Sequence, residues 1–398
     1  MFDLFMDEFG ISDMENLLKK AVNSEVTDNI LSTMSKKGDL SATEVAFLEN
    51  LSKGTLTTKV TTSVSPQKLV CLANITALMY EEPAVKTVWA QGLGLEEIGD
   101  ATSEGFLSNI ISVFIDAESN AVIVAFEGTP YLQAGFFRGI FGWLQDLLSA
   151  QLVPFYYPCE AEEPGLCTDL KNKYPDAQVY RGFVPEQKKE VVDERFDEAE
   201  ALMDKAIATL KAQGNEDKPK LIITGHSLGG ALSTNALVQV LLRGKNKDFS
   251  SVESYGFAPP VTGNPEYIQM TEDLLNATRA ESFMVINQYD YVPYLPPFLN
   301  FSHGNKTIYF DHDRRELRQI STLTQPFENQ PRNIFMPVLG YHSVKGQYLP
   351  LSRSALEGWS TKLREDPGWN ATTYGCSQLC GIGQCGLFAC DDTCYGML

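Results

Sequence analysis

The chain has 398 residues, of which 43% are hydrophobic, 11% aromatic and 21% charged, and its formal net charge is −19. This apolar content is enough to bury a large core, which excludes a globally disordered protein. The acidic balance argues against a nucleic-acid binder and against electrostatic docking on anionic membranes, because both need a cationic face. No uninterrupted apolar run is long enough to span a bilayer.

Residues 1–64 are expected to form a helical N-terminal extension or pro-region. Ser12 with Glu15, and Ser41 with Glu44, have the spacing of capping boxes, in which a hydroxyl and a carboxylate satisfy free amides at a helix start. The sequence leaves open whether this segment is a pro-region, an extra docking layer or a partner surface.

The cysteines and glycosylation acceptors favour an oxidising secretory compartment. Eight cysteines are present, five of them between residues 376 and 394. The start, MFDLFMDEFG, has acidic residues where a signal peptide would have a basic segment and an apolar stretch. We therefore expect the mature form of a secreted glycoprotein whose signal is absent; the alternative is a cytosolic protein with incidental acceptors. The six Asn-x-Ser/Thr acceptors are Asn50, Asn74, Asn276, Asn300, Asn305 and Asn370.

After residue 65 the predicted elements alternate between helices and strands, which is typical of an α/β fold with a mainly parallel sheet flanked by helices. A single domain is therefore expected over 65–365, and a small cysteine-rich tail over 366–398. Helices are expected from Ser65-Pro66 onward, over 186–212 and over 231–242, and strands over 110–115, 121–126, 221–224, 252–257, 283–287 and 306–310.

The strongest motif is Gly-His-Ser-Leu-Gly at residues 225–229, between an apolar β-branched strand and an apolar helix. This is the context of a nucleophile elbow, in which glycines let neighbouring chain segments pass a serine held on a tight, strained turn. The helix that follows directs its free amides and positive dipole end at the same place. Ser227 is therefore the candidate nucleophile; a glycine-rich turn without chemistry is the alternative.

A serine nucleophile needs a base, and the chain has only four histidines. His226 adjoins the serine in the chain and is not expected to turn back onto it. His303 and His312 flank a predicted strand, whereas His342 lies in a loop-like stretch after the last clear strand. The chain order of α/β-hydrolases, serine then acid then histidine, selects His342 as the base.

The same chain order selects Asp290, at the end of a predicted strand, as the acid. A carboxylate in this place fixes the tautomer of the imidazole and stabilises the imidazolium. Asp311 and Asp313 are its rivals.

Together these motifs resemble the class 3 lipases, the fungal-lipase-like branch of the α/β-hydrolases, over roughly residues 65–350. Residues 224–231 resemble the family's elbow, residues 287–297 its acid motif, and His342 with Tyr348 behind it the histidine segment. The resemblance implies an α/β-hydrolase fold, ester hydrolysis through a Ser-His-Asp triad and an acyl-enzyme, an acylglycerol substrate and no cofactor.

Residues 126–129, Phe-Glu-Gly-Thr, correspond to the family's oxyanion segment. The resemblance implies that Thr129 donates its amide and hydroxyl to the oxyanion, and that Leu228 donates its amide. Two positions depart from the family: Glu127 replaces the usual arginine and Tyr180 the common histidine. The charge reversal at Glu127 alters the local ion pairing but leaves the backbone donors in place.

Residues 131–151 are expected to form a lid. Trp143-x-x-Asp146 resembles the Trp-x-x-Asp of the family's lid. An apolar helix over a serine site would hide it in water and expose it at an oil–water interface; a permanently buried core helix is the alternative. The apolar residues at helical spacing are Phe136, Phe137, Ile140, Phe141, Leu144, Leu147 and Leu148.

Cys159 and Cys167 bracket a short segment and could close a loop, while the other six cysteines leave many pairings open. No metal is expected in the tail, because no histidine lies near it and its cysteine spacings do not suit zinc.

Several other functions remain possible on the sequence alone. A phospholipase A1 or a feruloyl-type esterase would use the same fold and triad. A lipase-fold lipid-binding protein without turnover is disfavoured, because all three triad residues are present. A serine peptidase is disfavoured, because the apolar segment 136–148 has no role in admitting a peptide. Acyl-chain and headgroup preference and the oligomeric state stay open.

Overall fold

The computed structural model describes residues 59–61, 64–81, 83–101, 110–129, 152–159, 165–180, 183, 191–288, 290, 292–294, 306–311, 316–320, 342, 344, 348–349 and 351–352. All of them fall within the compact unit Thr57–Leu398. The expected lid, the cysteine-rich tail and nearly all of the expected helical extension lie outside the described residues.

The elements follow one another as strands and helices, as the sequence predicts. In chain order they are β1 (Lys59–Thr61), α5 (Pro66–Leu78), α6 (Pro83–Gly92), β2 (Glu96–Ala101), β3 (Ile111–Asp116), β4 (Ala121–Phe126), β5 (Leu152–Pro154), α8 (Leu166–Lys173), β6 (Gln178–Tyr180), α9 (Val191–Ala212), β7 (Lys220–His226), α10 (Leu228–Leu242), β8 (Ser251–Phe257), α11 (Pro265–Thr278), β9 (Glu281–Asn287), β10 (Lys306–Asp311) and β11 (Glu316–Ile320).

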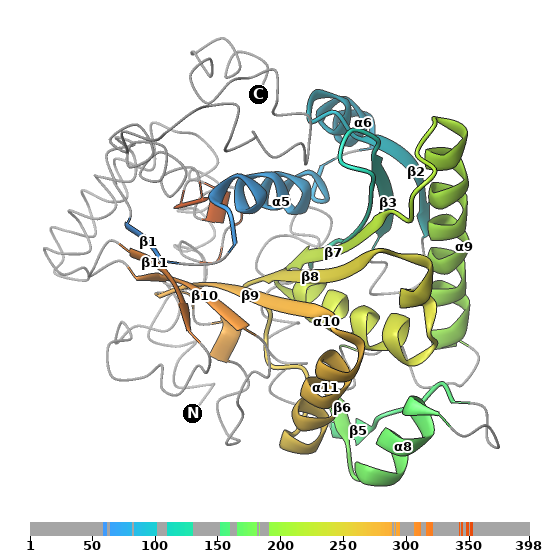
Figure 1. Cartoon of the computed structure of the whole chain (residues 1–398). Coiled ribbons are helices and arrows are strands. Elements are labelled where there is room, and N and C mark those ends of the chain that lie inside the picture. The colour runs from blue at the N-terminus through green and yellow to red at the C-terminus, as the bar shows by residue number, and fades with distance from the viewer. Residues whose placement is uncertain are drawn as a thin grey trace, which may run out of the picture. The chain divides into compact units, whose positions relative to one another are not determined.

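Among the described residues, nine strands form one sheet in the order β1-β11-β10-β9-β8-β7-β4-β3-β2 (Figure 1). The neighbouring strands β4, β7, β8, β9 and β10 run parallel, whereas β5 and β6 form a separate antiparallel pair. The pairs β2–β3, β3–β4 and β10–β11 are antiparallel. Helices lie on both sides of the sheet, with α5 opposite α10 and α11 (Figure 1). The expected α/β-hydrolase fold is confirmed.

The central strands are apolar runs because both faces of the sheet are covered. Every residue of β3 and β4 is buried. On one face, the buried side chains of these strands pack with those of α9, α10 and α11 in one hydrophobic cluster. This packing holds neighbouring strands in register, and the residues of the site follow the ends of β4, β7 and β9.

Helix α5 begins as the sequence predicts. Ser65 caps it by accepting a hydrogen bond from the Lys68 amide at 3.2 Å, and Pro66 occupies the first helical position. The Lys68 ammonium then pairs with Glu253 of β8 at 2.7 Å, which joins the helix to the sheet. This ion pair holds the first turn of α5 on the sheet, and Tyr80, just beyond the end of the helix, bonds to His226, the last residue of β7.

Two of the six expected glycosylation acceptors lie in the described part of the chain, and they differ in exposure. Asn74 is buried in α5, where its side-chain amide donates to the Val70 carbonyl at 2.9 Å. Asn276, on α11, is exposed. Of these two acceptors, only Asn276 is accessible to a glycosyltransferase in the folded protein.

The structure corrects one expectation of local structure, at residues 59–61, and supports another, at Cys159 and Cys167. Lys59–Thr61, within the expected helical extension, is instead a strand that pairs parallel with β11. The short loop expected between Cys159 and Cys167 is closed by a disulfide, and Cys71 is also disulfide-bonded. In the described part of the chain, no helix is both long and apolar enough to cross a membrane.

Candidate active site

Ser227 occupies the sharp turn between β7 and α10. Its backbone, at φ 58° and ψ −126°, lies in a region that side-chain-bearing residues rarely adopt, so the turn is strained. A Cβ atom at Gly225 would lie 2.2 Å from the backbone oxygen of Gly229, which explains why a glycine precedes the turn. The expected strand–turn–helix arrangement is present.

The structure brings together the three residues that the sequence selects. His342 Nε2 lies 2.7 Å from Ser227 Oγ, and His342 Nδ1 lies 2.8 Å from Asp290 Oδ2. Because the carboxylate only accepts, Nδ1 carries the proton, and Nε2 is free to accept the serine hydroxyl's hydrogen bond. All three side chains are buried, with exposed fractions of 3% for Ser227, 4% for His342 and 0% for Asp290.

The buried Asp290 carboxylate is satisfied by further donors. The Val292 amide donates to Oδ1 at 2.9 Å, and the Tyr348 hydroxyl donates to Oδ2 at 2.6 Å. Burial, and after it the charge on Asp290, raises the pKa of Tyr348 well above its ordinary value, so this phenol keeps its proton. The carboxylate is therefore fixed from two sides while it faces His342.

The other acids and histidines considered from the sequence lie elsewhere. Asp311, on β10, pairs with Arg318 at 3.1 Å. Asp313, His303 and His312 lie outside the described residues. Of the acids that the structure describes, the one that meets His342 is Asp290.

The two expected oxyanion donors lie at the same edge of the sheet as Ser227. Thr129 follows β4, whose last residue pairs with Gly225 of the neighbouring strand β7. Thr129 is 8% exposed, and its Oγ1 has no hydrogen-bond partner among the residues that the structure describes. Leu228 is the first residue of α10, where amides have no acceptor within the helix. Among the described residues the Thr129 hydroxyl is thus without a partner, and the position of Leu228 in the first turn leaves its amide without an acceptor inside the helix.

Glu127, where class 3 lipases usually have arginine, is buried and bound to the backbone. Its Oε2 accepts from the Ile110 amide at 3.1 Å. Burial raises the pKa of Glu127 to about 6, against the lowering effects of the Ile110 hydrogen bond and of Lys86. Lys86 itself is buried and pairs with Asp100 at 2.6 Å. A carboxyl group thus joins the end of β4 to the start of β3.

Two residues that the sequence did not select as functional lie against the triad. His226 bonds to the backbone of His342, and Tyr80 bonds to His226. Tyr180, the second departure from the family, is buried and packs edge-on against Phe183 with ring centroids 5.9 Å apart.

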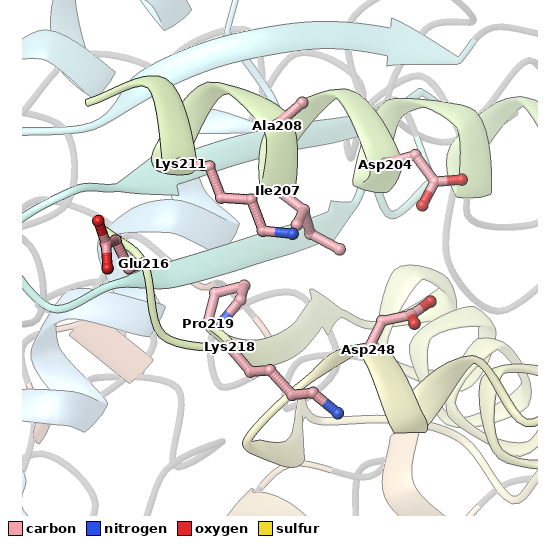
Figure 2. A pocket seen from close by; sticks show the side chains of 8 residues that line it. All are labelled: Asp204, Ile207, Ala208, Lys211, Glu216, Lys218, Pro219 and Asp248. Atoms are coloured by element: carbon pink, nitrogen blue, oxygen red, sulfur yellow. The ribbon is translucent and has the colours of Figure 1, made fainter. Parts of the chain in front are cut away.

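A surface hollow lies away from this site (Figure 2). Pro219, which lines it, precedes β7, whereas Ser227 follows that strand, so the hollow is at the opposite end of β7. Lys211 and Ile207 project into it from α9, and charges of both signs surround it (Figure 2). Its lining residues are Asp204, Ile207, Ala208, Lys211, Glu216, Lys218, Pro219 and Asp248.

The sheet order and the strained serine between β7 and α10 define an α/β-hydrolase. Residues 152–300 match the family model described as lipase (class 3), which confirms the resemblance expected from the motifs. This segment contains Ser227 and Asp290, while His342 and Thr129 lie outside it.

The chain is also similar in sequence to curated proteins and in structure to solved lipases. "Phospholipase A1-II 5" from the japonica and indica subspecies of Oryza sativa is 26% identical over 155 residues, which cover 37% of this chain and 32% of that protein. The match thus spans about a third of these relatives' length. Lipase II from Rhizopus niveus is 17% identical, with a TM-score of 0.46, over 71% of this chain and 92% of its own. The Rhizomucor miehei triacylglyceride lipase is 19% identical, with a TM-score of 0.44, over 72% and 96%.

Proposed function

We propose that this chain is a secreted serine lipase, which hydrolyses carboxylic esters of acylglycerols through an acyl-enzyme on Ser227. The observation that carries the proposal is the continuous line of hydrogen bonds from Ser227 through His342 to Asp290, at 2.7 and 2.8 Å. A buried serine on a strained turn, bonded to a neutral imidazole whose far side meets a carboxylate, is suited to nucleophilic attack on an acyl carbon.

In the first half-reaction, Ser227 Oγ attacks the ester carbonyl carbon while its proton passes to His342 Nε2. The tetrahedral intermediate then collapses: the bond to the leaving alcohol breaks, and His342 returns the proton to that alcohol oxygen. The acyl group remains on Oγ. Water repeats the sequence in the second half-reaction, giving the carboxylic acid and free Ser227. Asp290 holds the imidazole and stabilises the imidazolium at each stage.

The negative charge on the tetrahedral oxygen is received by Thr129 and Leu228. The buried Thr129 Oγ1, which has no partner among the described residues, and the first-turn amide of Leu228, which has no acceptor within its helix, support this role. One donor of this type is typically worth about 3 kcal/mol of barrier.

The class 3 lipase match supports an acylglycerol substrate taken from a lipid phase. We propose that the apolar segment 131–151 is the lid that opens there. Phospholipase A1 is a second candidate, because the matching curated relatives carry that name. No cofactor enters either reaction, since the chain's own residues supply the nucleophile, the base and the oxyanion donors.

The direct test is the hydrolysis of a soluble short-chain p-nitrophenyl ester by wild type and Ser227→Ala. We expect the variant to fold and to lose nearly all turnover. Ser254→Ala is the matched control, because it removes another buried serine hydroxyl, on β8, and should retain activity. Full activity in Ser227→Ala would reject the proposal.

Two further measurements separate the candidates. Release of fatty acid from triacylglycerol compared with release from the first position of a phosphatidylcholine distinguishes a lipase from a phospholipase A1. A rate that rises in a step at the solubility limit of the ester supports the lid. A smooth hyperbola through that limit would discard it.

A further inference from the structure

His226 bridges a tyrosine and the backbone of the candidate base. Its Nε2 lies 2.6 Å from the His342 carbonyl oxygen, and its Nδ1 lies 2.8 Å from the Tyr80 hydroxyl. A carbonyl oxygen only accepts, so Nε2 carries the ring proton and Nδ1 accepts from Tyr80. The two contacts therefore select one tautomer of a neutral ring.

The surroundings of His226 keep the ring neutral. Its side chain is fully buried, and this burial, followed by the proximity of His342, lowers the pKa of His226 well below its ordinary value. The two imidazole rings lie 4.6 Å apart at their centroids. A charged His226 would oppose the imidazolium that must form on His342, whereas a neutral ring does not.

Tyr80, just beyond the end of α5, also meets the oxyanion segment. A Cβ atom at Gly128 would lie 1.9 Å from the Tyr80 hydroxyl and 2.7 Å from the His226 backbone oxygen. Only a glycine leaves room for the hydroxyl here. One phenol thus contacts both the segment that ends in Thr129 and the ring that holds His342.

We propose that Tyr80 and His226 are positioning residues, which hold the base and the oxyanion segment at a fixed separation on either side of Ser227. The inference rests on the proposed function. Ser227 and His342 are 115 residues apart in the chain. One hydrogen bond joins their side chains, and a second joins the His342 carbonyl to His226, the residue that precedes Ser227. This second link fixes the backbone of His342, and a displacement of about 1 Å at such a group can cost about 100-fold in rate.

The test measures kcat and KM on a soluble p-nitrophenyl ester for three variants. Tyr80→Phe removes one hydroxyl, and we expect kcat to fall about tenfold, the upper range for one hydrogen bond. His226→Leu removes both contacts, and we expect a fall of about 100-fold. His226→Gln keeps a side-chain N–H for the His342 carbonyl, and we expect it to recover most of kcat. In all three, KM should stay within about twofold, because the proposed role concerns the placement of His342 and of the oxyanion segment and not the binding of the ester.

A matched control separates positioning from loss of a buried hydroxyl. Tyr157→Phe removes a phenolic hydroxyl that donates to the Tyr174 carbonyl at 2.7 Å. This hydroxyl is remote from the triad, so the variant should keep full kcat. Tyr80→Phe combined with His226→Leu should cost no more than His226→Leu alone, because both changes break one chain of contacts. If His226→Leu does not fold, the two single variants Tyr80→Phe and His226→Gln, measured separately, still test the positioning role.

The outcomes distinguish the two proposals. An inactive wild type would reject the proposed function itself. An active wild type with full kcat in Tyr80→Phe and His226→Leu would overturn the positioning role. So would a rise in KM at constant kcat, or equal losses in His226→Gln and His226→Leu.

Discussion

Replacing Asp290 by asparagine separates the charge of the acid from its shape. The Asp290 side chain accepts from His342 and Tyr348 through Oδ2 and from Val292 through Oδ1. Two donors meet Oδ2, so the asparagine oxygen should take that place and its nitrogen should face Val292. His342 then keeps its tautomer but loses the negative partner of its imidazolium. Two unit charges about 4 Å apart interact by about 4 kcal/mol at an effective dielectric constant of about 20, which corresponds to about 10³-fold in kcat.

The assay is kcat on a soluble p-nitrophenyl ester, with circular dichroism to check that Asp290→Asn folds. Asp311→Asn is the matched control. Asp311 pairs with Arg318 at 3.1 Å and does not meet the base, so its kcat should stay within about twofold of wild type. If Asp290→Asn kept more than about a tenth of kcat, or if Asp311→Asn lost as much, the assignment of the acid would be refuted.

Three further predictions concern stability, measured by urea unfolding. Folding raises the pKa of Glu127 from 4.5 to about 6, so this group binds more protons in the folded state in that window, and its contribution to stability falls as pH rises through it. Glu127→Gln removes this penalty, and its advantage over wild type should grow by about 1–2 kcal/mol between pH 4 and pH 8; a constant difference would contradict the buried acid. Gly225→Ala drives a Cβ to 2.2 Å from a backbone oxygen and should cost at least about 3 kcal/mol, whereas Gly165→Ala, with open space around it, should be nearly neutral; equal effects would argue against the tight elbow. Replacing Cys159 and Cys167 together by serine should lower the free energy of unfolding by about 2–3 kcal/mol without altering kcat. An unchanged urea midpoint would show that this disulfide does not stabilise the fold.

The sequence predicts the centre of the fold better than its edges. Strand β7 and helix α10 are long, apolar and separated by a glycine-rich turn, so local pattern and final structure agree. The pairing of β1 with β11 could not be predicted, because both strands are short and carry charged residues. Their strand conformation depends on a partner more than 250 residues away in the chain.

The candidate site shows the same division. Chain order and motif spacing predict Ser227, Asp290 and His342, and the structure places them in hydrogen-bonding contact. The part played by Tyr80 could not be predicted, because in the sequence it is only an aromatic residue within the helix expected from Ser65-Pro66 onward. Its contact with His226 depends on where α5 packs on the sheet. Similarly, the acceptor motif at Asn74 carries no information on burial.

The central claim is that the Ser227 hydroxyl is activated by His342. Its most direct test is covalent labelling of the folded chain by a phosphonate ester, with the modified peptide identified by mass spectrometry. We predict one label per chain, on Ser227, and a labelling rate that falls at least about 10³-fold in His342→Ala. A label on another residue, or an unchanged rate in His342→Ala, would contradict the claim.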